Sequence, residues 1–268
     1  MICEYLSGPS PIGLAHRGGW LVDDSGRVRT ELENTALAFQ HAIDLGYRYL
    51  ETDVHATADG VALAFHDATL DRATDRGGAI ERLPYSEVKR ARVGGSEPVP
   101  VLEELLGSWP EARFNIDVKA DAAVEPLAEA LRRTNAWNRV CVGSFDQRRL
   151  DRARRAFGRR VSTSCGPVDV ARLRFSCFTP VLSWLARRGV DCVQIPLRRR
   201  NFPILSRDLI ATAHRLEMQV HVWTINDPAL MRRLLDAGVD GIVSDNTVEL
   251  RRVLAERGAW HNTGRSTV

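Results

Sequence analysis

Long apolar runs and paired cysteines are missing from this sequence of 268 residues, and neither sign of charge is in strong excess. No apolar run approaches the roughly 18 residues that a membrane-spanning helix needs, so we expect no stable insertion into a membrane. The amino terminus has no charged region followed by an apolar stretch, and a strand-like run already begins at Ile12. We therefore expect no cleaved signal peptide.

Cysteine is scarce, and its spacing argues against two common uses. The five cysteines form no C-x-x-C pair and are Cys3, Cys141, Cys165, Cys177 and Cys192. An odd number without such a pair fits neither a zinc site nor a disulfide framework. Cys141 and Cys192 fall inside apolar runs, where a reduced cysteine behaves as a small core hydrophobe. A reducing compartment fits this pattern best, so we expect a cytoplasmic protein.

The charge balance is mildly basic, with 37 Lys and Arg against 34 Asp and Glu. The arginines alternate with acidic residues along the expected helices, so we expect no nucleic-acid partner. The densest basic run, Arg198 to Arg200, lies between Pro196 and Pro203 and is typical of a solvated loop. Anion or surface binding by this run is the less favoured alternative. The sequence indicates no particular oligomeric state.

Short β-rich runs alternate with longer amphipathic stretches, a pattern typical of a parallel sheet with crossover helices. The expected strands cover residues 12–15, 49–54, 113–118, 140–143, 161–164, 192–195, 218–224 and 241–244. The clearest helical stretches cover residues 35–45, 122–133, 147–157 and 228–236. Eight such repeats close a barrel at about 250 residues. We therefore predict an α/β fold, with one (β/α)8 TIM-barrel domain over residues 1–268.

One region interrupts this rhythm. Between about residues 55 and 110, short segments are punctuated by Asp59-Gly60, Gly77-Gly78 and Gly94-Gly95. Asp59-Gly60 precedes the apolar run 61–65, a pattern typical of a turn that returns a strand toward the barrel mouth. We predict a small insertion after the second barrel strand.

Acidic residues lie at the ends of two neighbouring expected strands. Glu51 and Asp53 are two residues apart, so their side chains leave the same face of a strand. Asp117 ends the next strand, and the carboxyl ends of a parallel barrel form its active-site face. Three carboxylates without a nearby thiolate suit a hard divalent cation better than zinc. The alternative left open is that Glu51 and Asp53 pair with arginines inside the barrel.

Two histidines and two cationic residues are expected at the same opening. His16 and His66 each follow an apolar strand, and histidine titrates near neutral pH, so the two could serve as acid and base. Arg17 offers a planar fork to phosphate oxygens, and Lys119 offers a compact charge. The alternatives are hydrogen-bonded core histidines and salt bridges to the nearby carboxylates.

The order of these motifs resembles that of the glycerophosphodiester phosphodiesterase family over nearly the whole chain. The motifs are His16-Arg17-Gly18, Glu33-Asn34-Thr35, Glu51-x-Asp53, His66-Asp67, Asp117-Val118-Lys119, Trp223-Thr224-Ile225-Asn226 and the segment 240–245 (DGIVSD). Each motif alone is weak, whereas the ordered set is strong. The resemblance implies a TIM barrel that hydrolyses glycerophosphodiesters, a small-molecule substrate, to glycerol 3-phosphate and an alcohol.

The resemblance also implies a metal site and its ligands. One divalent cation, Mg²⁺ or Ca²⁺ with Mn²⁺ as a further candidate, would be held by Glu51, Asp53 and Asp117, with Glu33 beside it. In the family the third acidic ligand is commonly Glu, so Asp117 is a departure with a shorter reach. Metal preference could differ for that reason, or a water could complete the coordination.

The remaining implied roles concern catalysis and substrate. His16 and His66 would be the acid/base pair, with the roles of the two not assigned. Arg17 and Lys119 would hold the phosphate, and Trp223 would line the substrate side of the barrel mouth.

Other readings stay open. Lysophospholipids could be substrates of the same site, with an apolar rim formed by Trp20, Phe175, Phe178, Trp184 and Phe202. A barrel aldolase or lyase could use Lys119 as a Schiff-base lysine, although Asp117 nearby favours the ammonium form. A phosphate-binding module without turnover would keep the fold and change the function.

Overall fold

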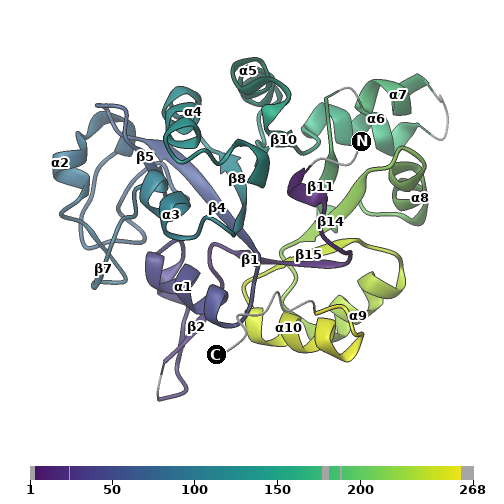
Figure 1. Cartoon of the computed structure of the whole chain (residues 1–268), viewed down its shortest axis with the longest axis horizontal. Helices are drawn as coiled ribbons and strands as arrows, with labels where there is room; N and C mark the ends of the chain where they lie inside the picture. Colours follow the sequence, from purple (N-terminus) through teal and green to yellow (C-terminus); the bar gives the residue numbers. More distant parts are fainter. Residues whose placement is uncertain (1–3, 24, 177–180, 188, 261–268) are drawn as a thin grey trace.

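The computed structural model describes residues 4–23, 25–176, 181–187 and 189–260, and these form a parallel β-barrel surrounded by helices (Figure 1). The barrel strands follow the order β10-β9-β8-β4-β1-β15-β14-β11. A parallel bridge between Ser164 and Cys192 brings β10 beside β11 and nearly closes the ring. The predicted (β/α)8 barrel is therefore confirmed. Its strands are β1 (Ile12–His16), β4 (Tyr49–Ala56), β8 (Arg113–Val118), β9 (Val140–Gly143), β10 (Ser162–Thr163), β11 (Cys192–Pro196), β14 (Gln219–Trp223) and β15 (Gly241–Ser244).

Several helices begin after a polar residue whose side chain caps them. Thr35 accepts a hydrogen bond from the Ala38 amide, and Asp227 caps a helix that starts at Pro228, as its sequence predicts. The helices are α1 (Ala36–Asp44), α3 (Leu102–Ser108), α4 (Val124–Arg133), α5 (Gln147–Phe157), α6 (Pro167–Phe175), α7 (Val181–Arg187), α8 (Arg207–Arg215), α9 (Pro228–Asp236) and α10 (Thr247–Glu256). In the described part of the chain, none is long and apolar enough to cross a membrane.

The predicted insertion follows β4 and lies at one side of the barrel (Figure 1). It begins with β5 (Ala62–Ala64), which pairs antiparallel with β4 after the Asp59-Gly60 turn. Apolar side chains of the insertion form a small core of their own, which includes Leu63, Leu70 and Ile80. Its other elements are η3 (Ile80–Arg82), α2 (Tyr85–Val88), β6 (Arg92–Val93) and β7 (Glu97–Pro98).

Short strands and 3-10 turns lie in the connections between the barrel strands and the helices. Two antiparallel hairpins project from the loops, β2 (Leu21–Val22) with β3 (Val28–Arg29) and β12 (Arg198–Arg199) with β13 (Phe202–Pro203). Single turns of 3-10 helix complete the fold at η1 (Glu4–Leu6), η2 (Thr30–Leu32), η4 (Asp121–Ala123), η5 (Trp137–Arg139) and η6 (Gly158–Arg160).

A second apolar cluster closes the amino-terminal end of the barrel. Tyr5 from η1 packs with Cys141 and Cys192, whose sulfur atoms lie 3.8 Å apart, and all three are fully buried. Arg113 donates to the Tyr5 carbonyl at 2.6 Å and fixes η1 in place. The expectation that Cys141 and Cys192 are core residues is confirmed, while Cys3 and Cys177 lie outside the described residues. With this end filled, the opposite end is the one open to ligands.

Candidate active site

A cavity of about 630 Å³ opens at the carboxyl ends of the barrel strands. Its volume falls within the usual range for small-molecule sites. All eight residues predicted from the sequence line it: His16, Arg17, Glu51, Asp53, His66, Asp117, Lys119 and Trp223. Loops and strand ends far apart in the sequence thus meet at one opening.

Strand register places the carboxylates side by side. Glu51 and Asp53 share one face of β4, and Asp117 on β8 is the direct partner of Asp53 in the parallel ladder. All three side chains are largely buried. Buried carboxylates need compensating partners, because an isolated charge is costly to remove from water.

Arg17 and Lys119 supply these partners. Lys119 Nζ lies 2.8 Å from Asp53 Oδ1 and 2.6 Å from Asp117 Oδ2, and Arg17 Nε lies 3.1 Å from Asp53 Oδ2. Burial would raise the pKa of Asp53, but the two cations outweigh it and the pKa is lowered. Burial raises the pKa of Asp117, and Lys119 only partly offsets it. The salt bridges considered from the sequence are therefore present.

Glu51 is the carboxylate with the weakest compensation. Its Oε2 accepts from the Arg17 amide at 3.0 Å and lies 3.8 Å from His16 Nε2. Burial and the neighbouring Asp53 charge raise the pKa of Glu51 to about 7. The amide is presented by a tight turn: Gly18 has a φ of 87°, and a Cβ there would lie 2.8 Å from the Ala38 side chain.

His16 is oriented by Asp245 at the end of β15. Its Nδ1 lies 2.6 Å from Asp245 Oδ1, and Asn226 Nδ2 donates to the other oxygen of Asp245 at 2.8 Å. A carboxylate can only accept, so Nδ1 carries a proton and Nε2 faces the site. Burial would lower the pKa of His16, but Glu51 and Asp245 outweigh it and the pKa is raised.

His66 has a similar carboxylate partner from the insertion. Its Nδ1 lies 2.6 Å from Asp67 Oδ1, and Arg72 holds the other oxygen of Asp67 and also contacts Glu33. Burial would raise the pKa of Asp67, but hydrogen bonds from Arg72 and His66 lower it to about 2. The buried ring of His55 contacts the His66 backbone carbonyl through Nε2 at 3.1 Å.

Two buried oxygen atoms lie among the residues that the resemblance assigns to a metal site. Asp117 Oδ1 and Asn115 Oδ1 are buried and have no hydrogen-bond partner among the described residues. With Glu51 and Asp53 they form an all-oxygen donor set, which suits Mg²⁺ or Ca²⁺. In the described part of the chain, however, no three acidic, His or Cys residues are gathered closely enough to form a ready coordination shell. Lys119 lies between Asp53 and Asp117 instead.

The resemblance places Glu33 beside the metal. In the structure Glu33 contacts Arg17, which in turn contacts Asp53. Its Oε2 accepts from Arg17 Nη1 at 2.8 Å, so it contacts the site through this arginine. Asn34, the next residue, donates from Nδ2 to Asp53 Oδ2 at 3.1 Å and is almost fully buried. The Glu33-Asn34-Thr35 motif thus serves the same site from a separate loop.

Aromatic side chains border the mouth. Trp223 packs edge-on against Phe145 at 5.3 Å between ring centroids, and Lys119 Nζ lies 5.2 Å from the Phe145 centroid. Phe175 and Phe202 also line the cavity and are about half exposed. Of the other proposed rim residues, Trp20 and Trp184 do not line it, and Phe178 lies outside the described residues.

Asp245 and Asp67, which position the two histidines, have no role predicted from the sequence. The sequence motifs include both Asp245 and Asp67, but Asp245 is 229 positions from its partner His16. Only the pairing of β1 with β15 reveals that contact. Asp67 follows His66 directly, so a carboxylate next to a candidate histidine was an available signal.

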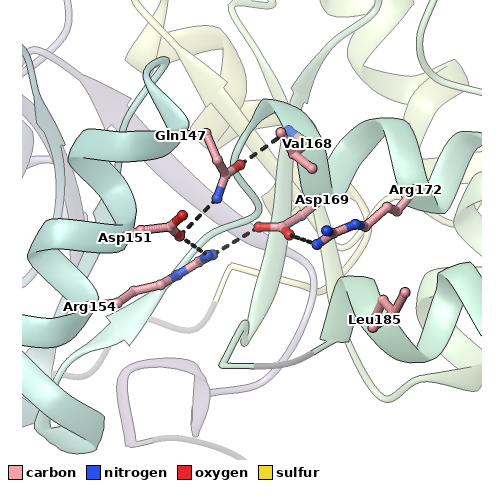
Figure 2. Close-up of a pocket in the computed structure, with 7 residues that line it drawn as sticks. All are labelled: Gln147, Asp151, Arg154, Val168, Asp169, Arg172 and Leu185. Carbon is pink, nitrogen blue, oxygen red and sulfur yellow. Dashed lines mark hydrogen bonds and ion pairs between the residues drawn. The ribbon is translucent and has the colours of Figure 1, made fainter.

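A smaller cavity of about 290 Å³ lies between α5 and α6 (Figure 2). We call its polar and charged residues the α5–α6 cluster: Gln147, Asp151, Arg154, Asp169 and Arg172. Asp169 accepts from Arg154 at 3.0 Å, from Arg172 at 3.4 Å and from the Gly166 amide at 3.1 Å. Every buried polar atom of this cluster has a partner, which favours a structural role.

Comparison with known proteins relates the chain to one family. The sequence model of the glycerophosphoryl diester phosphodiesterase family matches residues 16–249. A protein of Mycobacterium tuberculosis named "Probable glycerophosphodiester phosphodiesterase 2" is 41% identical over 261 residues, which cover 96% of each chain. The protein named lysophospholipase D GDPD1 of Homo sapiens is 25% identical, over 90% of this chain and 85% of that protein.

Solved structures with low sequence identity share the fold. A glycerophosphodiester phosphodiesterase from Agrobacterium tumefaciens superimposes with a TM-score of 0.70 at 22% identity, covering 89% of this chain and 98% of that one. A phosphodiesterase of Oleispira antarctica, in complex with the product sn-glycerol-3-phosphate, gives 0.72 at 21% identity, covering 92% and 97%. These likenesses support the barrel architecture.

Proposed function

Because the chain belongs to the glycerophosphoryl diester phosphodiesterase family and is a phosphoric diester hydrolase, we propose that it hydrolyses glycerophosphodiesters to glycerol 3-phosphate and an alcohol. One observation carries the proposal. His16 and His66 line one cavity with Arg17 and Lys119, and each histidine has its Nδ1 bound to a carboxylate. Two oriented imidazoles beside fixed positive charge suit acid/base chemistry on a phosphodiester.

This orientation supports the proposed acid/base roles of the two histidines. Asp245 and Asp67 hold the protons of His16 and His66 on Nδ1, which leaves each Nε2 to exchange a proton with substrate. One histidine removes a proton from the attacking hydroxyl, and the other donates a proton to the leaving alcohol. Arg17 and Lys119 attract the phosphate oxygens and stabilise the negative charge that grows in the transition state.

The reaction is proposed to run in two displacements. The free glycerol hydroxyl next to the ester attacks phosphorus, a new O–P bond forms, and the bond from phosphorus to the alcohol oxygen breaks. This nucleophile is favoured because it belongs to the same molecule and is already close. Water then opens the cyclic phosphate by breaking one ring P–O bond, with the histidines in exchanged roles, and glycerol 3-phosphate is released.

A divalent cation, Mg²⁺ or Ca²⁺, is proposed as cofactor. Glu51, Asp53 and Asp117 would hold it, with the buried oxygen of Asn115 beside them. When bound, it would add positive charge that polarises the phosphoryl group. Because Lys119 contacts both Asp53 and Asp117, we propose that it gives up at least one of these contacts on loading and turns toward the substrate phosphate.

A second substrate class has specific support. Phe175 and Phe202 expose apolar surface along the same cavity, and a human relative is named a lysophospholipase D. Lysophospholipids would use the same histidines and place an acyl chain over these rings. A Schiff-base role for Lys119 is disfavoured: burial would lower its pKa, but Asp117 and Asp53 outweigh burial and raise it, which keeps the amine protonated.

The test is release of glycerol 3-phosphate by purified protein from glycerophosphocholine, glycerophosphoethanolamine and glycerophosphoinositol. Each substrate is assayed with EDTA and with added Mg²⁺, Ca²⁺ or Mn²⁺. We expect release that depends on a divalent cation. Release unaffected by EDTA would remove the cation from the proposal, and release from a lysophospholipid alone would select the second substrate class. No release from any substrate would contradict the proposed activity.

A further inference from the structure

Four arginines line the cavity on the side away from β1 and β4. Arg174 comes from α6, and Arg198, Arg199 and Arg200 come from the β12–β13 hairpin. We call these four residues the arginine group. They follow β10 and β11, which stand opposite β4 and β1 in the circular order of the barrel strands. A substrate held at the carboxylates can therefore extend across the mouth toward the arginine group.

In the described part of the chain, the arginine group has no acidic counterpart. Among the described residues, no carboxylate pairs with any of the four, and Arg198 donates only to the Asn201 carbonyl at 3.3 Å. The acidic residues that line the cavity are Glu51, Asp53 and Asp117, which belong to the catalytic side. On the outer helices, by contrast, arginines such as Arg132 and Arg252 pair with glutamates one helical turn away.

Arg174 has the most restricted position of the four. Its guanidinium lies 5.7 Å from the ring centroid of Phe202, and its Nε is buried without a hydrogen-bond partner among the described residues. A buried donor without an acceptor is uncommon in folded proteins. The β12–β13 hairpin places Arg198 and Arg199 in its first strand, with Arg200 at the turn with a φ of 52°.

We propose that the arginine group selects glycerophosphodiesters whose alcohol carries an additional anionic group, such as a second phosphate. The inference rests on the proposed function and specifies its substrate. An oxyanion on the alcohol would meet guanidinium groups that have planar donors suited to phosphate. A cationic alcohol such as choline would approach four positive charges with no carboxylate among the described residues on that side, which disfavours it.

An anionic membrane surface is the less favoured partner of the same arginines. All four line the cavity that holds the catalytic residues, and Arg174 has a buried Nε. A membrane would instead contact side chains that project from the rim.

The aromatic rings of Phe145 and Trp223 offer the competing possibility of a choline site by cation–π contact.

The experiment compares three soluble diesters that differ in the charge of the alcohol: glycerophosphoinositol 4-phosphate, glycerophosphoinositol and glycerophosphocholine. We expect kcat/KM to be at least about tenfold higher for the phosphorylated alcohol than for the neutral one, and lowest for choline. Because the arginine group acts away from the reacting bond, the difference should appear in KM. The preference should fall as salt is raised, since exposed charges are screened.

Substitutions identify the residues responsible. The triple variant R198Q/R199Q/R200Q should lose the preference for glycerophosphoinositol 4-phosphate and keep its kcat/KM for glycerophosphoinositol within about twofold. A charge-matched control, R155Q/R159Q/R207Q, removes three exposed arginines that do not line the cavity and should keep the preference. R174Q should reduce the preference by itself.

The outcomes separate this inference from the proposed function. Equal KM values for the three diesters, or a preference for glycerophosphocholine, would overturn the inference and leave the activity intact. Equal KM values together with sedimentation on phosphatidylglycerol vesicles, lost in the triple variant, would assign the arginines to a membrane surface. Failure to hydrolyse any diester would overturn both the proposed function and the inference.

Discussion

Two charged clusters lie on this barrel, and they differ in how completely their polar atoms are paired. At the mouth, Glu51, Asp53 and Asp117 are buried beside Arg17 and Lys119, yet Asp117 Oδ1 has no partner among the described residues. In the α5–α6 cluster of Figure 2, Asp169 accepts three hydrogen bonds. Both clusters bring acidic and basic side chains together.

This difference distinguishes a ligand-binding site at the mouth from a structural cluster between α5 and α6. A network in which every buried polar atom is paired has no buried atom left for a ligand, and it fixes the elements that contribute to it. The carboxylates at the mouth offer more hydrogen-bond acceptors than donors among the described residues fill. The Glu51 carboxyl, whose pKa is raised to about 7, is an example. Such a network gains stability when a cation or substrate binds. Predictions that break or sharpen this comparison follow, from the largest expected effect to the smallest.

The largest effect is expected from the two histidines at the mouth. H16A and H66A should each lower kcat by about a thousandfold, because acid/base catalysis contributes on that order. The free energy of unfolding should change little, since both side chains are partly exposed. Initial rates with glycerophosphoinositol and urea unfolding test both statements. Asp151→Asn in the α5–α6 cluster is the control and should keep full activity; near-normal turnover in both histidine variants would refute the acid/base assignment.

For Asp169 we expect the opposite result, which is a loss of stability with unchanged activity. D169A leaves Arg154 and the Gly166 amide without this acceptor in a largely buried place, which should lower the free energy of unfolding by about 3 kcal/mol. Below its melting temperature the variant should retain kcat and KM. Loss of activity without loss of stability would show that the α5–α6 cluster serves catalysis.

A substitution of Glu51 tests whether the carboxylates at the mouth bind a cation. E51Q keeps the shape of the side chain and removes its charge, so the affinity for Mg²⁺ or Ca²⁺ should fall at least about a hundredfold, while stability without added metal stays similar or rises. Titration calorimetry measures the affinity without reference to turnover. D151N serves again as the control, and unchanged affinity in E51Q would exclude Glu51 as a ligand.

The smallest effect concerns a fully buried histidine, His221, in contrast to the partly exposed His16 at the mouth. His221 lies inside the barrel, accepts from Gln194 at Nδ1 and donates to Gln219, and burial lowers its pKa to about 4. An unfolded histidine titrates near 6.5. The unfolded state therefore binds the extra proton as pH falls from 6.5 toward 4, and stability is lost over that window.

Urea unfolding of the protein and of H221Q at pH 7 and pH 5 checks this. The protein should lose about 2 kcal/mol more than the variant between the two values. An equal loss in both proteins would show that His221 does not titrate as its burial implies. The contrast with His16, where carboxylates raise the pKa, separates an imidazole buried for packing from one placed for chemistry.

Much of the fold was readable from local patterns. All eight barrel strands lie where apolar β-rich runs predict them, and the insertion follows the second barrel strand as predicted. Boundaries differ by one or two residues, as at β10, because strand ends depend on the neighbours that pair with them. The basic run Arg198 to Arg200 forms a short hairpin instead of a plain loop, since Phe202 and Pro203 provide a pairing partner.

The sequence by itself determined which residues face one another within a strand, as with Glu51 and Asp53, because alternation of side chains is a property of the extended chain. Only the tertiary structure decided which distant residues meet. Asp245 reaches His16 because barrel closure pairs β15 with β1, and the arginine group reaches the catalytic cavity because β10 and β11 complete the ring. Such contacts depend on register and closure, which short-range periodicity does not encode.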